Sequence, residues 1–557
     1  MPSNDCQIKK HTQLNYSQRK TIGAITTFVM LVLMLPAGSK AQKKTGRKPN
    51  ILFIAIDDLK PVLGCYGDKL VKTPNIDRLA ASGTVFLNTY CQQAVCGPTR
   101  ASLMTGKRPD YTKVWDLKTK MRDINPEILS LPQYLISQGY STQGIGKVYD
   151  PRDVDKQLDA PSWSVPFYNS SKEYFDQAQG EPVLGQYQSP ETKALVEKYN
   201  NEAIAQGMSK KDAKEYVQQK IKPSTECINV PDNAYEDGAI VFKSLDILAR
   251  LSKSETPFFF AVGIHKPHLP FVAPKKYWDL YRRDAMPLAR YQEKSKNAAD
   301  IAYTDIGEMR NYTDIPPLVS FTDQKGFGVT LPADKQKELL HGYYAAVSYS
   351  DALVGMLLRS LDSLKLADNT IVVLWGDHGW HLGDHNLWCK HTNFEQATRV
   401  PLIICAPGLK PGRTSATSEF VDLFPTLCDL AGVPQPDSLD GKSLLPVIKN
   451  NTASVKEFAV SQYPRSGSKD AQRLGLSSSK VMGYSIRNQR YRYTVWMGND
   501  FRSTQPFKKE WVVATEMYDY QEDPDETVNV VADKKYEKEA ASLYNEMLAF
   551  FKSQERN

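Results

Sequence analysis

The sequence predicts an α/β fold in which a mostly parallel sheet lies between helices, with a smaller C-terminal subdomain built on an antiparallel sheet. Three features predict this fold. Short apolar runs before residue 450 each end in a polar cluster instead of an alternating partner strand. Helical patterns lie between these runs, and strands that alternate with helices imply a parallel sheet covered on both faces. After about residue 450, short alternating strands replace the apolar runs.

Four apolar runs have the composition of strands buried on both faces. In NILFIAIDDL (50–59), the run from Ile51 to Ile56 leads directly into Asp57 and Asp58. The other three runs also end in ionisable residues: TPFFFAVGIHKPH (256–268) in His265 and His268, NTIVVLWGDHGWH (369–381) in Asp377 and His378, and the weaker STQGIGKVYD (141–150) in Lys147. Ligands of such sheets bind beyond the carboxyl ends of the strands, so we expect these side chains to meet at one edge.

Helices are predicted between the runs and at the C-terminus. TPNIDRLAASG (73–83) starts at a threonine cap and stops at a glycine, and YSDALVGMLLRSLDSL (349–364) places its apolar residues on one face. The segment SEFVDLFPTLCDLAGV (418–433) also reads as a helix. The predicted C-terminal unit has strands in VMGYSIRNQRYRYTVWM and ATEMYDYQ, followed by the helix KEAASLYNEMLAFFKS.

We predict three parts of the chain: a signal peptide (1–41), a large domain (42–450) with a helical insertion at about 150–255, and a C-terminal subdomain (451–557). The signal peptide is indicated by Arg19 and Lys20 before the apolar run TIGAITTFVMLVLMLPA, with cleavage after Ala41. The alternative is an uncleaved anchor, for which a run of about 17 residues is at the lower limit. Cleavage predicts an exported protein, in a periplasmic, secreted or lysosome-like compartment, without stable membrane insertion.

Composition excludes several classes of protein. Charged residues make up 24% and apolar residues 41% of the 557 residues, which argues against extended disorder. The net charge of +7 comes from scattered lysines without an aromatic and basic stripe, so no nucleic-acid partner is expected. The charge favours anionic substrates only weakly. The oligomeric state has no signature in the sequence.

Export changes how the cysteines are interpreted. Seven cysteines follow the predicted cleavage site, and an odd number in an oxidising compartment means that at least one has a fate other than an intramolecular disulfide. No C-x-x-C pair occurs, which disfavours a zinc knuckle or a thioredoxin-type site. We expect Cys405 and Cys428, which flank a loop and a helix, to be structural.

The ionisable residues at the strand ends point to a cation and an anion in one site. Asp57, Asp58 and Asp377 offer hard oxygen ligands, which suit Ca²⁺ or Mg²⁺. Several carboxylates at one buried edge need a cation. Lys147, Lys390 and a histidine, together with Arg100, would cradle a small tetraoxo anion. Phosphoryl or sulfuryl transfer is the reaction class that needs both.

The segment CGPTR (96–100), followed by ASLMTG, resembles the C-x-P-[ST]-R signature of type I, formylglycine-dependent sulfatases of the alkaline phosphatase superfamily. Further motifs of this family follow in family order over about residues 48–535: IDDL, TPNIDRLAASGTVF, GIGKVY, AVGIHKPHLPF, GDHGWHLGDHNLWCKHTNFEQATRVPLII and YDYQEDPDETVN. HKPHLPF and GDHGWHLGDHNLWCKHTNFE look closest to the iduronate-2-sulfatase branch.

The resemblance implies an alkaline phosphatase-like fold and a set of site residues. Cys96 would be converted to Cα-formylglycine by a formylglycine-generating enzyme, and Arg100 would hold the modified residue. One Ca²⁺ would be bound by Asp57, Asp58, Asp377, His378 and the modified Cys96. Sulfate would contact Lys147, His265 and Lys390. Around them we expect the sugar to be bound by His268, Trp380, His381, Asp384, His385 and Asp150. The alternative for Trp380 is a packed aromatic side chain.

The expected reaction is hydrolysis of a sulfate ester on a carbohydrate, for example a 2-O-sulfated uronic acid or another terminal sulfated sugar. The formylglycine aldehyde hydrates to a geminal diol, and one hydroxyl attacks sulfur after Asp377 takes its proton. His265 or His268 protonates the departing sugar oxygen. The second hydroxyl then expels sulfate. Alternatives are a phosphatase or phosphodiesterase of the same superfamily and a non-catalytic protein that binds sulfated glycans.

One position departs from the branch pattern. The iduronate-2-sulfatase branch has GKVFHP where this chain has GKVYDP, so Asp150 replaces a histidine that contacts the formylglycine hydrate or the sulfate. An ionised aspartate accepts hydrogen bonds but cannot donate one. We therefore expect either that another group takes the place of this histidine or that the pocket differs in its substrate or its pH preference.

Overall fold

The computed structural model describes residues 47–168, 186–304, 307–316, 330–465, 481–498 and 509–554. The predicted signal peptide lies outside the described residues. Residues Lys48–Asn557 form one compact unit. Among the residues described, no helix combines the length and the apolar character that a membrane crossing requires.

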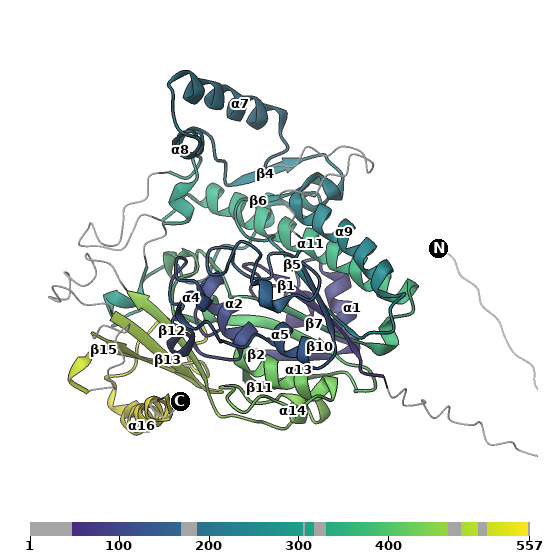
Figure 1. Cartoon of the computed structure of the whole chain (residues 1–557). Helices are drawn as coiled ribbons and strands as arrows, with labels where there is room; N and C mark the ends of the chain where they lie inside the picture. Colours follow the sequence, from purple (N-terminus) through teal and green to yellow (C-terminus); the bar gives the residue numbers. More distant parts are fainter. Residues whose placement is uncertain are drawn as a thin grey trace, which may run out of the picture. The chain divides into compact units, whose positions relative to one another are not determined.

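A seven-stranded sheet lies at the centre of this unit, in the order β11-β2-β10-β7-β1-β5-β3 (Figure 1). Only β10 runs antiparallel to its neighbours, so the prediction of a mostly parallel sheet is confirmed. The strands are β1 (Asn50–Ile56), β2 (Thr84–Tyr90), β3 (Ser141–Gly146), β5 (Phe258–Ile264), β7 (Thr370–Gly376), β10 (Arg399–Cys405) and β11 (Gly412–Glu419).

The register of four adjacent strands places their carboxyl ends side by side. Ile56 of β1 lies opposite Ile264 of β5 and Gly376 of β7, and β3 pairs with the other side of β5. The residues that follow these strands therefore emerge at one edge, as the apolar runs predicted. The backbones of β3 and β5 approach so closely here that a Cβ atom on Gly263 would lie 2.1 Å from the carbonyl carbon of Lys147. Glycine is needed at that position to place Lys147.

Each face of the sheet has its own apolar core. On one face, Leu52, Ile54 and Ile56 of β1 pack with three helices: α1 (Pro74–Ser82), α9 (Glu236–Leu251) and α11 (Ala333–Ser363). On the other face, Ile51 and Phe53 pack with α2 (Cys96–Thr105), α5 (Leu131–Ser137), α13 (Leu423–Ala431) and α14 (Leu445–Lys449). Figure 1 shows α9 and α11 above the sheet and α13 below it.

Two helices differ in length from the sequence prediction. The helix predicted at 349–364 is the last part of α11, which begins at Ala333. Residues 339–351 are buried on all sides, so this half of the helix has no amphipathic pattern that could reveal it. The helix predicted at 418–433 begins only at Leu423, because the chain up to Glu419 pairs as strand β11 and then forms a 3₁₀ turn.

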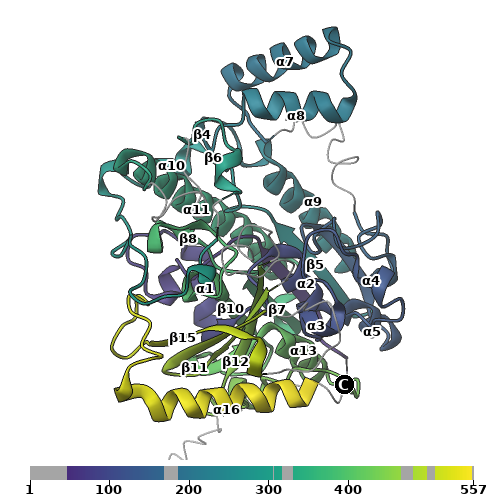
Figure 2. The ribbon, with the colours of Figure 1, turned by 90° about the vertical axis from the view of Figure 1, so that its left-hand side faces the viewer.

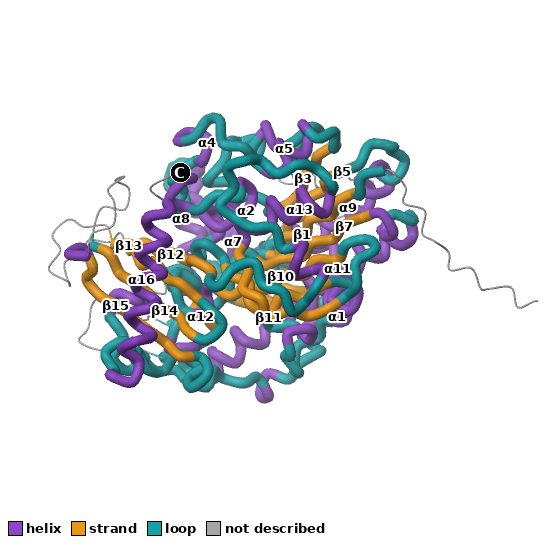
Figure 3. Tube along the Cα trace, turned by 90° about the horizontal axis from the view of Figure 1, so that it is seen from below, coloured by secondary structure: helices purple, strands orange, loops and turns teal. Residues whose placement is uncertain are grey.

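A second, antiparallel sheet is formed near the C-terminus, as predicted (Figure 3). Its order is β12-β13-β14-β15, and the terminal helix packs on it through Met547 and Phe550. The elements are β12 (Ala459–Arg465), β13 (Val481–Arg487), β14 (Tyr491–Met497), β15 (Val512–Asp519) and α16 (Glu537–Gln554). Strand β12 has no counterpart in the sequence prediction. The proposed domain boundary at 451 stays a prediction.

The segment from 150 to 255 contains a helical hairpin of α7 (Pro190–Ala205) and α8 (Lys210–Lys220), which stands at one end of the unit (Figure 2). It also contains a short strand, β4 (Thr225–Ile228), paired with β6 (Phe271–Pro274). The remaining short elements are α3 (Pro109–Thr112), α4 (Met121–Ile124), α10 (Lys275–Trp278), β8 (His381–Leu382), β9 (Trp388–Cys389) and α12 (Glu395–Thr398). The limits of the predicted insertion stay a prediction.

Candidate active site

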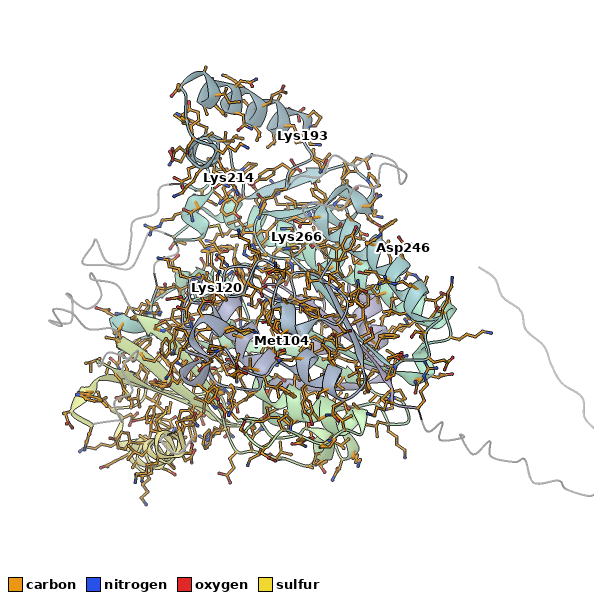
Figure 4. All side chains as sticks on the ribbon, in the orientation of Figure 1. Met104, Lys120, Lys193, Lys214, Asp246 and Lys266 are labelled. Atoms are coloured by element: carbon orange, nitrogen blue, oxygen red, sulfur yellow. The ribbon has the colours of Figure 1, made fainter. Side chains whose placement is uncertain are left out.

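Cys96 is the first residue of α2 and lies in a cavity of about 950 Å³ at the carboxyl edge of the large sheet. Lys147, His265, His268 and Lys390 also line this cavity. The rest of α2 is buried, and Met104, near its other end, lies among the packed side chains of the unit (Figure 4). The helix therefore holds Cys96 on a rigid support at the sheet edge.

Arg100, one turn along α2, joins two of the predicted carboxylates. Its Nη2 lies 3.1 Å from Asp57 Oδ1, and its Nε lies 3.0 Å from Asp377 Oδ2. It also donates to the carbonyl oxygens of Lys147 and Val148. The side chains of Arg100, Asp57 and Asp377 are completely buried. A charged cluster without solvent needs this degree of pairing, because an unpaired buried charge is strongly destabilising.

Two lysines bind the carboxylates that follow β1. Lys147 donates to Asp57 Oδ2, and Lys390 Nζ lies 2.9 and 3.1 Å from the two oxygens of Asp58. Lys390 also lies 3.1 Å from Glu308 Oε2 and 4.8 Å from the ring centre of Trp380. Lys147, after β3, and Lys390, after β9, thus approach Cys96 from different parts of the chain.

Four of the five predicted metal ligands converge. Asp57, Asp58, Cys96 and His378 each offer a donor atom within 4.8 Å of the others. Asp377 lies beside this group, where its Oδ1 accepts from the backbone N–H groups of Asp58 and His378. Its other oxygen, bound to Arg100, lies 3.6 Å from His378 Nε2. With Asp377 included, three of the five residues offer carboxylate oxygens, which Ca²⁺ and Mg²⁺ prefer as ligands.

The protonation pattern of this group fits a bound cation. His378 Nδ1 lies 3.0 Å from the carbonyl oxygen of Gly379, which only accepts, so Nδ1 carries the proton. The other ring nitrogen, Nε2, lies 3.3 Å from Asp58 Oδ1. Burial, opposed by Lys390 and increased by the charge of Asp57, raises the pKa of Asp58 to about 7. The donor atoms of Asp57, Asp58, Cys96 and His378 face a common centre, and a divalent cation there would offset the buried negative charge.

The unmodified Cys96 thiol is a poor nucleophile in this environment. Its Sγ lies 3.4 Å from His378 Nε2 and 3.6 Å from Lys147 Nζ. Burial and the neighbouring Asp57 nevertheless raise the pKa of the thiol well above its ordinary value. In the described part of the chain, all seven cysteines are free thiols, among them the buried Cys428 and the partly exposed Cys405.

The pKa values of the two histidines after β5 are shifted in opposite directions. The Nδ1 atom of His265 lies 2.9 Å from Asp237 Oδ1. Burial lowers the pKa of His265, but Asp237 outweighs it and raises the pKa above the ordinary value. The Nε2 atom of His268 lies 3.1 Å from Glu308, yet burial, Lys390 and Lys147 lower the pKa of His268. Between the two, His265 is the better proton donor.

Four predicted sugar-binding residues, Asp384 among them, do not line the cavity. Trp380 and His381 are fully buried, and His381 Nε2 lies 2.9 Å from Thr392 Oγ1. His385 is stacked on Phe394, with ring centres 4.7 Å apart. Asp150 does line the cavity, but Arg152 occupies both of its carboxylate oxygens.

Three residues of the site were missed by sequence reasoning: Asp237, Glu308 and Arg152. Asp237 lies in the first turn of α9 and receives the backbone N–H groups of His265 and Lys266. Glu308 lies in an irregular segment with no periodicity. An acidic residue in the first turn of a helix is normally explained by the helix dipole, so no local signal separates Asp237 from an ordinary helix start.

Comparison with known proteins gives the family of this chain. Residues 49–433 match the model of the sulfatase family, and residues 383–553 match that of the N-sulphoglucosamine sulphohydrolase C-terminal region. The chain belongs to the sulfatase family. This sulfatase is 34% identical to human iduronate 2-sulfatase (Homo sapiens) over 531 residues, which cover 86% of the chain and 90% of the relative. It is a sulfuric ester hydrolase, as the sequence motifs predicted.

Solved structures confirm the fold. A protein in complex with its substrate D-glucosamine-2-N,6-O-disulfate superposes with a TM-score of 0.66 at 21% identity and covers 92% of this chain and 98% of its own. A phosphonate monoester hydrolase from Agrobacterium radiobacter gives a TM-score of 0.64 at 20% identity, with 91% and 96% coverage. At these identities the likeness shows the shared architecture of the sheet and its helices.

Proposed function

We propose that this sulfatase hydrolyses sulfate esters of sugars through a Cα-formylglycine formed from Cys96. One observation carries the proposal: the cysteine of the CGPTR signature lies in the cavity beside Lys147 and His378, not in the apolar core. A sulfated sugar as substrate is supported by the relative named iduronate 2-sulfatase and by the structural neighbour bound to a disulfated glucosamine. A 2-O-sulfated uronic acid is one candidate.

The proposal includes one calcium ion held by Asp57, Asp58, Asp377, His378 and the modified Cys96. When bound, the ion would neutralise the carboxylates and draw negative charge toward itself, which makes a nearby hydroxyl more acidic and a sulfuryl oxygen more easily stabilised. It would also take the place of the lysines as partner of Asp57 and Asp58. Lys147 Nζ and Lys390 Nζ would then be available to the substrate's sulfate.

Each step of the proposed reaction uses particular residues of the chain. The hydrated formylglycine at position 96 supplies a hydroxyl that attacks sulfur, and Asp377 receives its proton. Lys147 and Lys390 donate hydrogen bonds to the sulfuryl oxygens. The sulfur–oxygen bond to the sugar breaks, and His265 donates a proton to the departing oxygen. The second hydroxyl at position 96 then loses its proton, the carbon–oxygen bond to sulfate breaks, and the aldehyde is restored.

The proposal is tested by mass spectrometry of the tryptic peptide that contains Cys96. Protein produced together with a formylglycine-generating enzyme should show the conversion of the thiol to the aldehyde, and the converted fraction should track the rate of sulfate release. Active protein with an unmodified thiol would refute it. A panel of sulfate and phosphate monoesters of the same sugars separates it from phosphatase activity, since faster release of phosphate would favour that alternative.

The export of the protein and its maturation by a formylglycine-generating enzyme belong to the same proposal. The apolar run after Arg19 and Lys20 supports export. N-terminal sequencing of the mature protein tests it, with Gln42 expected as the first residue.

The Asp237→Asn variant is expected to move the alkaline limb of the pH–rate profile to lower pH by about one unit. The reaction needs protonated His265, so the rate falls as pH rises through the pKa of this residue. Asp237 raises that pKa against burial, with a smaller contribution from Glu236 and an opposing one from Lys147. Removing the Asp237 charge lowers the pKa of His265, and the profile measured by sulfate release should shift accordingly.

Asp246→Asn is the matched control for this prediction. Asp246 lies on the same helix, α9, but is exposed (Figure 4). This variant should leave the profile in place. An unchanged profile for Asp237→Asn would assign the proton to another group.

A further inference from the structure

One wall of the cavity is a loop that follows β3 and carries an arginine toward the opening. Asp150, Arg152 and Lys156 of this loop line the cavity together with Cys96. The side chain of Asp150 is completely buried, whereas that of Arg152 is 51% exposed. The loop therefore presents a guanidinium group to the same space in which Cys96 and Lys147 lie.

Asp150 fixes the orientation of this guanidinium group. Its Oδ1 lies 2.8 Å from Arg152 Nε, and its Oδ2 lies 2.7 Å from Arg152 Nη2. Oδ1 also accepts from the backbone N–H of Arg152, at 3.0 Å. A bidentate pair holds the planar group in one orientation, and less side-chain entropy is then lost when a ligand binds. Both oxygens of Asp150 thus accept from Arg152, and Asp150 acts as a support for the guanidinium group.

Three other cationic groups that line the cavity are already engaged with acidic residues. Lys147 binds Asp57, Lys390 binds Asp58 and Glu308, and His265 binds Asp237. Arg152 uses only the edge formed by Nε and Nη2, and within the described ranges its Nη1 has no hydrogen-bond partner. The hydrogen bonds that Arg152 donates to Asp150 raise the pKa of Arg152 against its partial burial, and Arg152 lines the same cavity as Cys96.

We propose that Arg152 binds a second anionic group on the substrate, a carboxylate or a further sulfate on the sugar that carries the ester to be cleaved. The inference rests on the proposed function. Lys147 and Lys390 serve the sulfate that is removed, and a separate anion on the same small molecule needs its own donor. A guanidinium group with one free edge matches the two oxygens of a carboxylate or sulfate, which a lysine does not.

The test uses a double variant, Asp150→Asn with Arg152→Gln, because removing Arg152 alone would leave Asp150 as an unpaired buried charge. Sulfate release is measured with two pairs of substrates, each with a dianionic and a monoanionic member. The first pair is a methyl uronoside 2-O-sulfate and its uronamide, and the second is a disulfated methyl glucosaminide and its monosulfated form. For whichever dianionic substrate is natural, KM should rise about 10- to 100-fold, the range expected for a lost charged hydrogen bond. Its kcat, and both constants for the monoanionic partner, should change little.

Lys156→Met provides the control, since Lys156 lines the same cavity without a buried carboxylate to orient it. It should change KM for the dianionic substrate less than the double variant does. The uronoside pair tests a carboxylate and the glucosaminide pair tests a second sulfate. The pair in which KM rises for the dianionic compound identifies the anion that Arg152 binds. Equal losses on dianionic and monoanionic substrates, or an effect of Lys156→Met as large as that of the double variant, would overturn the assignment.

Binding measured without turnover separates this inference from the proposed function. Calorimetric titration of the Cys96→Ala protein with the same four compounds should show tighter binding of the dianionic compounds than of their monoanionic partners. This preference should disappear when Asp150→Asn and Arg152→Gln are introduced into the same protein. If the wild-type protein released no sulfate but this preference were present, the proposed function would fail and the role of Arg152 would stand. If no titration showed a preference for the dianions, the role of Arg152 would be refuted.

Discussion

Replacing Cys96 with alanine is expected to reduce sulfate release to less than about one-thousandth of the wild-type rate, since removal of a covalent nucleophile costs factors of this size or larger. The loss should appear in kcat, because the hydroxyl groups formed at position 96 act in the bond-breaking steps. Binding of an intact sulfated sugar to the variant should persist through the lysines around the cavity. Sulfate release by ion chromatography and binding by calorimetry measure the two effects separately.

Cys428→Ala is the control for the loss of a buried thiol. Cys428 is also completely buried, but it packs in the core below the large sheet, in α13. Its removal should lower the free energy of unfolding by a small cavity cost, about 1 kcal/mol, and leave sulfate release near the wild-type rate. If Cys96→Ala behaved like Cys428→Ala, then Cys96 would be a structural thiol and the formylglycine mechanism would be refuted.

The sequence was most informative where ionisable residues directly follow a buried strand. The continuous apolar run up to Ile56 is typical of a buried strand, so the edge that receives Asp57, Lys147, His265 and Asp377 was predictable before any contact was known. The antiparallel direction of β10 was not predictable, because a strand buried on both faces has the same composition in either direction.

The residues that were missed act through partners far along the chain. Glu308 reaches Lys390 across 82 positions, and Asp237 meets His265 across 28. Periodicity reports only neighbours within one helix or strand, so such pairs arise from packing and leave no local pattern. The same limit explains Trp380, His381 and His385. They belong to a motif with many polar and aromatic residues, but the chain turns them into the protein interior, where they pack instead of lining the cavity.

Arg100→Met is expected to lower the free energy of unfolding by about 3–5 kcal/mol when calcium is removed with a chelator, the range for breaking a buried ion pair. Methionine fills a similar volume, but it leaves the buried carboxylates of Asp57 and Asp377 without the guanidinium group. The carbonyl oxygens of Lys147 and Val148 also lose a donor. The shift of the urea unfolding midpoint, multiplied by the slope of the transition, gives the loss.

The matched control for this effect is Arg490→Met, which removes another bidentate arginine–aspartate pair. Arg490 binds Asp519 at 2.8 and 2.6 Å, but the arginine side chain is 40% exposed. Water screens such a pair, so its loss should cost far less than the loss of Arg100. Saturating calcium should narrow the difference in unfolding free energy between wild type and Arg100→Met. It should leave the difference between wild type and Arg490→Met unchanged, because only the first pair shares its carboxylates with the proposed ion. Equal costs for the two variants would mean that Arg100 does not balance the charge of the carboxylate cluster.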